Sequence, residues 1–112
     1  MESNRIKKVN RLILKELSEI FLFETKKMPG VLISVTQVRV TPDLGIAHAY
    51  LSFFPSDKAN ELLSNINENI KRLRFELGKR IGQQLRIVPN LVFYLDDSLD
   101  YMDNIDNLLK KD

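Results

Sequence analysis

The sequence predicts an α+β fold in which helices cover one face of a small β-sheet. Apolar residues recur every three or four positions over residues 4–26 and again over 57–85, as in helices packed on a core. Residues 31–41 and 46–54 are rich in β-branched residues and partly alternate, as strands do, and a third such run begins at Pro89. Elements in this order bury their apolar sides as a two-layer sandwich.

Composition indicates one globular domain over residues 1–112, with a short acidic tail from about residue 96. The chain has 44% hydrophobic and 29% charged residues, which is typical of a soluble protein. It has no cysteine, no apolar run near the roughly 20 residues that span a bilayer, and no apolar stretch after its first charges. We therefore expect a cytoplasmic protein without disulfides.

The elements can be followed in order along the chain. The first helix carries its stripe from Ile6 to Phe21 and stops at Met28-Pro29-Gly30. The turn residues of TPDLG join the first two strands as a hairpin. In the second strand, alternate residues from Ala47 to Phe53 share one face, and His48, Tyr50 and Ser52 share the other. Residues 57–85 are long for one helix in so small a domain, so a break is expected within them.

Charge is unevenly distributed although the net charge is only +2. Residues 1–90 hold fifteen Lys and Arg against nine Asp and Glu, a balance of +6, whereas residues 91–112 hold two against six, a balance of −4. Such asymmetry favours a polyanionic partner for the basic part. Mixed surface charge that serves only solubility remains the alternative.

The residue types and motifs of the chain give little support to an enzymatic function. His48 is the sole histidine, no thiol is present, and no phosphate-binding glycine loop occurs. The only dense carboxylate cluster runs from Asp96 to Asp106, and its spacing differs from that of the calcium loop. A small metal-dependent hydrolase built on these aspartates is therefore a remote alternative, and we predict no enzyme, cofactor or metal site.

The stretch KRLRFELGKRIG, residues 71–82, carries the strongest functional signal. With the helical stripe centred on Ile70, Leu73 and Leu77, Phe75 points away from the core among basic residues. Basic side chains neutralise phosphates, and an aromatic ring can stack on an unpaired base. The other interpretation is that Phe75 packs under a loop or the tail and that Gly78 and Gly82 mark the kink. The predicted RNA-binding residues are Lys71, Arg72, Arg74, Phe75, Lys79, Arg80, Arg86, Lys7, Lys8, Arg11, Lys15 and Arg39.

The chain resembles the bacterial ribosome-binding factor A family over roughly residues 4 to 110. The resemblance is carried by ISVTQVRVTPDLGIAHAYLSF, with its central T-P-D-L, and by LRIVPNLVFYLDDSLDY. The second segment contains R-x-x-P-x-L-x-F, from Arg86 to Phe93, and the pair Asp97-Ser98. An apolar segment from Ile105 to Leu109 completes the resemblance.

The resemblance implies a KH-like (type II) domain with the order helix-strand-strand-helix-kink-helix-strand. It also implies a non-catalytic, monomeric cytoplasmic factor in ribosome biogenesis. Such a factor binds the immature 30S subunit and its 16S ribosomal RNA, assists late maturation including 5′-end processing, and supports growth in the cold. Ribosomal proteins are possible further partners, and no membrane is implied.

This sequence departs from the family pattern at the helix kink. Family members often carry Ala-x-Gly there, and the corresponding positions here are Asn69-Ile70-Lys71. The departure predicts either a kink made differently, nearer Gly78, or a straighter helix. A protein-interaction module that uses the strand face of Tyr50 and Tyr94 is the main alternative to RNA binding.

Overall fold

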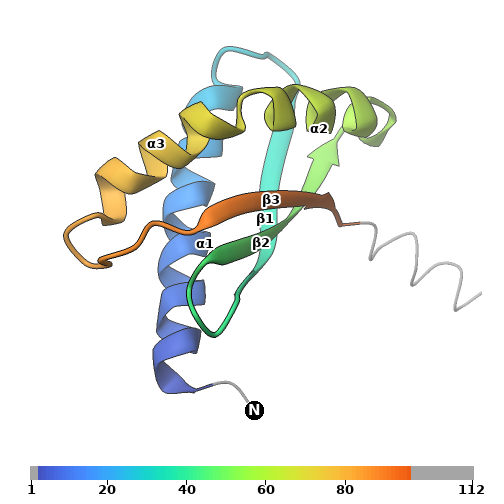
Figure 1. Cartoon of the computed structure of the whole chain (residues 1–112). Helices are drawn as coiled ribbons and strands as arrows, with labels where there is room; N and C mark the ends of the chain where they lie inside the picture. The colour runs from blue at the N-terminus through green and yellow to red at the C-terminus, as the bar shows by residue number, and fades with distance from the viewer. Residues whose placement is uncertain (1–2, 97–112) are drawn as a thin grey trace, which may run out of the picture.

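The computed structural model describes residues 3–96, which form three α-helices, a short 3₁₀ helix and three strands (Figure 1). The order along the chain is that expected for a KH-like α+β domain, so the predicted fold class is confirmed. The elements are α1 (Asn4–Thr25), β1 (Leu32–Val40), β2 (Ile46–Phe54), η1 (Ser56–Lys58), α2 (Ala59–Glu68), α3 (Ile70–Ile81) and β3 (Asn90–Leu95).

The sheet has the strand order β1-β2-β3, with β2 in the centre. β2 is antiparallel to β1 and parallel to β3, because α2 and α3 carry the chain back between them. Residues of β2 alternate between buried and more exposed positions, as predicted, and the helices cover the buried face. The other face of the sheet, which carries His48 and Tyr50, has no helix over it in the described part of the chain, and we call it the open sheet face.

A β-bulge at Thr36 keeps Ile33, Val35, Val38 and Val40 of β1 on one face of the sheet. Val35 pairs with Leu51 and Gln37 with Tyr50, so Thr36 is the extra residue. The inward apolar residues stand at odd positions before the bulge and at even positions after it, and one added residue brings both sets to the same side, whereas Leu32 is exposed. The Thr36 hydroxyl donates to the Tyr50 carbonyl oxygen and contacts the Asp96 carboxylate.

The hairpin turn is held by its own polar groups. The Asp43 carboxylate accepts from the Thr41 hydroxyl at 2.6 Å and from the Gly45 N–H at 3.0 Å. These bonds lower the pKa of Asp43, the Thr41 hydroxyl having the larger effect. Leu44 takes a positive φ of 61°, which lets its side chain reach the core. The Asn10 side-chain oxygen accepts from the Val40 N–H at 2.8 Å and ties α1 to the end of β1.

The long helical region breaks at Asn69, and the expectation of a kink nearer Gly78 is wrong. Asn69 leaves helical geometry, with φ −106° and ψ 19°. Its side-chain amide donates to the Asn65 carbonyl oxygen at 2.8 Å, and its own carbonyl accepts from the Leu73 N–H, so one residue ends α2 and begins α3. Gly78 lies inside α3, and Gly82 closes its last turn by donating to the Gly78 carbonyl.

The predicted acidic tail after Asp96, with Asp97-Ser98 and the segment to Leu109, lies outside the described residues. Among residues 3–96, no helix is long and apolar enough to cross a membrane.

Candidate nucleic-acid interface

The outward side of α3 carries a row of Lys71, Phe75 and Lys79, spaced four residues apart and so aligned along the helix. Phe75 is 65% exposed, because Leu73, Leu77 and Ile81 occupy the buried side. The Lys79 ammonium lies 5.0 Å from the Phe75 ring centroid and 3.3 Å from the Glu76 carboxylate. The outward direction predicted for Phe75 is therefore observed, and the row joins positive charge to an exposed aromatic ring.

Arg72 and Arg80 lie on the flank of α3 that faces α1. Arg72 pairs with Glu24 at 2.7 Å, and Arg80 pairs with Glu16 at 3.3 Å and Glu19 at 2.9 Å. These ion pairs hold α3 against α1. Both guanidinium groups stay partly exposed, and each has five N–H donors, so donors remain for an anion.

Arg74 has a structural role that the sequence pattern did not indicate. Its Nε donates to the Pro89 carbonyl oxygen at 3.1 Å, and a terminal nitrogen donates to the Val88 carbonyl at 2.7 Å. These bonds fasten the segment between α3 and β3. Arg74 therefore positions the start of β3 through two of its five N–H groups.

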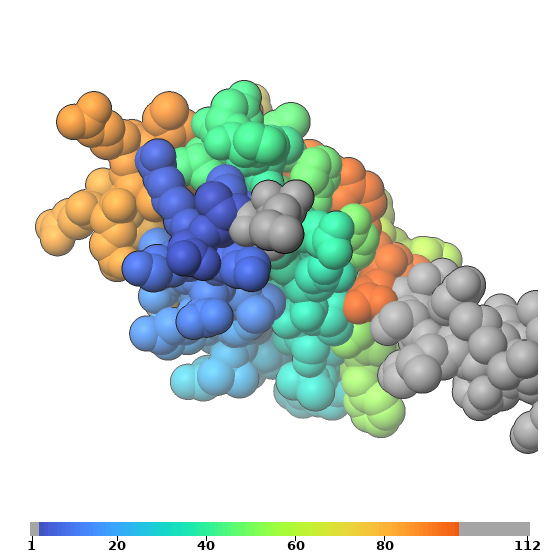
Figure 2. Space-filling model, turned by 90° about the horizontal axis from the view of Figure 1, so that it is seen from below, coloured from blue at the N-terminus to red at the C-terminus, as the bar shows by residue number. Residues whose placement is uncertain are grey.

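The other predicted residues lie in three separate places. Four exposed basic residues occupy the first half of α1: Lys7, Lys8, Arg11 and Lys15. Arg86 lies in the segment between α3 and β3. Arg39, near the end of β1, lines a hollow with Arg5 and the hairpin turn. Figure 2 shows the first turns of α1 beside that turn. The structure thus brings together the α3 residues and leaves Arg39 apart from them.

Sequence reasoning missed an exposed group at the end of α1. Phe23 is 59% exposed, and the ammonium groups of Lys26 and Lys27 lie 6.0 and 5.7 Å from its ring centroid. The signal was available, because Phe23 and Lys27 repeat the four-residue spacing of Phe75 and Lys79. The repeat was hard to recognise in the sequence, because Phe23 ends a continuous apolar run that begins at Ile20.

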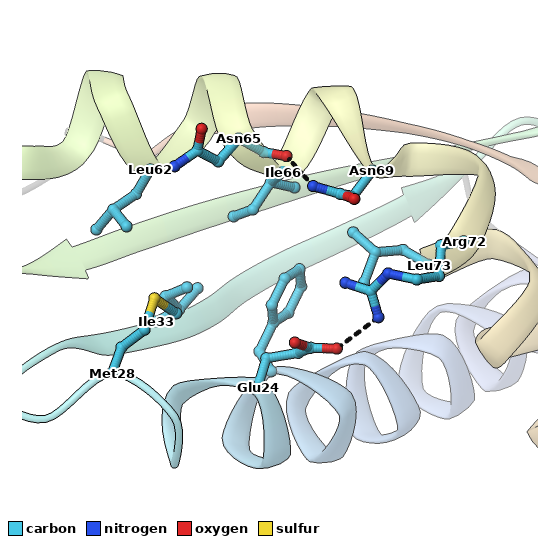
Figure 3. Close-up of a pocket in the computed structure, with 10 residues that line it drawn as sticks. Glu24, Met28, Ile33, Leu62, Asn65, Ile66, Asn69, Arg72 and Leu73 are labelled. Atoms are coloured by element: carbon cyan, nitrogen blue, oxygen red, sulfur yellow. Dashed lines mark hydrogen bonds and ion pairs between the residues drawn. The ribbon is translucent and has the colours of Figure 1, made fainter.

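A hollow of about 180 Å³ lies beside the helix break (Figure 3). The Glu24–Arg72 ion pair and the Asn65–Asn69 hydrogen bond stand at its rim. Its floor is apolar and is formed by side chains of α1, β1, α2 and α3, among them Phe21, Ile33, Ile66 and Leu73. The break at Asn69 therefore adjoins the α1–α3 ion pairs.

On the open sheet face, three neighbouring side chains, His48, Tyr50 and Tyr94, contact one another. The Tyr50 and Tyr94 rings are stacked with centroids 5.0 Å apart, and the Tyr94 hydroxyl lies 2.9 Å from His48 Nδ1. His48 is half-buried in this group, as expected for an ordinary strand residue. Among residues 3–96, no group of three or more His, Cys, Asp or Glu side chains is placed to hold a metal ion.

The fold and the exposed basic helices define a KH-like α+β domain with a candidate surface for nucleic acid. Comparison of the sequence with family models matches residues 5–109 to ribosome-binding factor A. The chain belongs to the ribosome-binding factor A family.

Relatives agree with this assignment, and a crystal structure shares the fold. Ribosome-binding factor A of Flavobacterium psychrophilum is 49% identical over 97% of this chain and 85% of that protein. The Cytophaga hutchinsonii protein is 48% identical over 99% of this chain and 84% of that protein. The crystal structure of the Thermus thermophilus protein matches with a TM-score of 0.64 at 21% identity, covering 80% of this chain and 94% of that one. This likeness shows a shared fold.

A second structural match comes from a Thermus thermophilus ribosome-binding factor A homology model that was fitted into a cryo-EM map of a 30S complex. Its TM-score is 0.59 at 24% identity, over 74% of this chain and 86% of that one.

Proposed function

We propose that this protein binds the immature 30S ribosomal subunit in the cytoplasm through its 16S ribosomal RNA, as a monomer and without catalysis. Family membership and the 30S complex of the Thermus thermophilus protein support the subunit as partner. On this proposal the protein assists late maturation, including processing of the 5′ end of the RNA, and supports growth in the cold.

The observation that carries the proposal is the exposed row Lys71, Phe75 and Lys79 on α3. An ammonium group on a helix surface neutralises a phosphate without having to leave a buried partner. Arg72 and Arg80 border the row and retain exposed N–H groups. The basic residues of α1 extend the surface, and Arg74 lines the same hollow as Phe75 and Lys79 while it holds the segment before β3.

The test is co-sedimentation of the protein with purified precursor and mature small subunits, using Lys71→Glu/Lys79→Glu. We expect the wild type to sediment with precursor subunits and much less with mature ones. The double variant should bind precursor subunits at least about tenfold more weakly, because two phosphate contacts are replaced by repulsion. Both side chains are exposed, so thermal unfolding should be almost unchanged.

A matched control lowers the net charge by the same four units elsewhere. Lys58→Glu with Asn60→Asp and Ser64→Asp changes exposed positions of η1 and α2. Binding that weakens equally in both variants would indicate nonspecific attraction. Unchanged binding of Lys71→Glu/Lys79→Glu would overturn the proposal and favour a protein contact through the open sheet face.

A further inference from the structure

Two exposed phenylalanines, one on α1 and one on α3, share the same local arrangement. Phe23 is followed by Lys27, and Phe75 by Lys79, each four residues later. In both cases the lysine ammonium lies over the ring, at 5.7 Å and 5.0 Å from the centroid. The Phe23 ring has a second such neighbour, because the Lys26 ammonium lies 6.0 Å from its centroid.

The two rings lie on either side of a row of α3 side chains. Phe23 borders a hollow of about 160 Å³ between α1 and α3, together with Arg72, Glu76 and Arg80. Phe75 is adjacent to Glu76 in sequence and points outward from the same helix. The hollow is lined by three basic and two acidic side chains: Lys27, Arg72, Arg80, Glu24 and Glu76.

Each ring has at least one unpaired lysine close to it in the chain. Lys26 and Lys71 form no ion pair within residues 3–96, and Lys71 stands one helical turn before Phe75. An exposed apolar ring flanked by exposed ammonium groups complements a ligand that has both flat apolar faces and negative charge. Nucleotides have both, whereas a double helix hides the faces of its bases inside the stack.

We propose that Phe23 and Phe75 are stacking positions for bases of an unpaired RNA segment that crosses α3. Lys26, Lys27, Lys71 and Lys79 hold the phosphates on either side of the two bases. This inference rests on the proposed function and deepens it, because it assigns the ligand as unpaired RNA and adds the end of α1 to the surface.

Tryptophan fluorescence tests the stacking directly, since the chain contains no tryptophan. Phe23→Trp and Phe75→Trp each place one reporter on the surface and keep an aromatic ring. A single-stranded oligoribonucleotide should quench both reporters strongly, whereas an RNA duplex of equal length and inorganic polyphosphate should quench neither. The control is Phe54→Trp, because Phe54 is 68% exposed on the open sheet face and should not respond.

Binding to precursor subunits supplies the second readout. Phe23→Ala and Phe75→Ala should each weaken binding roughly tenfold, as loss of one base–aromatic stack does, and the Trp variants should restore it. Both rings are exposed, so the unfolding temperature should change little.

The outcomes separate this inference from the proposed function. If the Ala variants bind like the wild type while Lys71→Glu/Lys79→Glu does not, the stacking inference is wrong and the proposed function stands. Equal quenching by duplex and single strand would also overturn it. If the Ala variants lose subunit binding but no oligonucleotide quenches the reporters, the phenylalanines contact a protein and the inference again fails.

Discussion

The helical surface that carries Phe23 on α1 and Phe75 on α3 differs from the open sheet face in what surrounds its aromatic side chains. On the sheet face, Tyr50 stacks on Tyr94, and the Tyr94 hydroxyl lies 2.9 Å from His48 Nδ1, so these three side chains are partners of one another, whereas Phe54 at the end of β2 is 68% exposed. On the helical surface, Phe23 and Phe75 contact only lysine ammonium groups among the ring interactions observed in residues 3–96.

This difference separates aromatic residues that stabilise the fold from those that are available to a ligand. Stacked rings bury area and gain a further 0.5–1.5 kcal/mol or so from their geometry. A phenylalanine on an exposed helix face adds little to folding, because its surface stays in water. Its presence between lysines is therefore better explained by binding than by stability.

The largest expected effect is on stability, in Tyr50→Ala. Loss of this half-buried stacked ring should lower the free energy of unfolding by about 2 kcal/mol, while affinity for precursor subunits stays within about twofold. Phe75→Ala should show the reverse, with stability changed by less than about 0.5 kcal/mol and affinity reduced. Urea unfolding and subunit binding of the two variants measure the contrast. If fully folded Tyr50→Ala bound precursor subunits more weakly than the wild type, the contrast between the two surfaces would not hold.

A smaller effect distinguishes two basic residues of α3 that the sequence grouped together. Arg74→Ala should cost about 1.5 kcal/mol of stability, because charged hydrogen bonds to the Val88 and Pro89 carbonyls are lost. Lys71→Ala should cost less than about 0.5 kcal/mol, since no ion pair holds it within the described chain. Thermal unfolding of both variants tests this. Equal stability losses would show that Arg74 does not fasten the segment before β3.

The smallest effect concerns the hairpin turn and pH. The pKa of Asp43 is lowered by the Thr41 hydroxyl and the Gly45 N–H, so the turn is stabilised by the ionised carboxylate. That contribution is complete above the unfolded pKa of about 3.9 and is lost as pH falls through the lower, folded pKa. Asp43→Ala should therefore destabilise the protein more at pH 7 than at pH 2.5 in urea unfolding. The same difference at both pH values would count against the turn bonds.

Much of the fold was predictable because its elements follow local patterns. The boundaries of β2 match the prediction, since strict alternation from Ala47 to Phe53 specifies one buried face. The position of the helix break was not predicted, because Gly78 and Gly82 have the lowest helix propensity in residues 57–85. Asn69 makes the break with its side chain, and the series Asn65, Asn67 and Asn69 of poor helix formers was the signal. The Thr36 bulge was likewise visible as a shift of the apolar period.

The candidate site was predictable only where helix periodicity decides direction. That Phe75 points away from the core follows from its angle to Leu73 and Leu77. The roles of Arg72, Arg74 and Arg80 depend on contacts 14 to 64 residues away in the chain, which no local pattern contains. The charge pattern of the sequence does not distinguish a residue such as Arg74, which forms hydrogen bonds in the structure, from one such as Lys71, which forms no ion pair within residues 3–96.

The salt dependence of binding to precursor small subunits tests the central claim most directly. Each phosphate contact contributes a slope of about −0.7 to −0.9 to log affinity against log salt. The wild type should therefore show a steep slope, and Lys71→Glu/Lys79→Glu should show one that is shallower by about 1.4 to 1.8. A wild-type affinity that is flat across salt, or a variant slope equal to that of the wild type, would contradict an RNA-binding surface on α3.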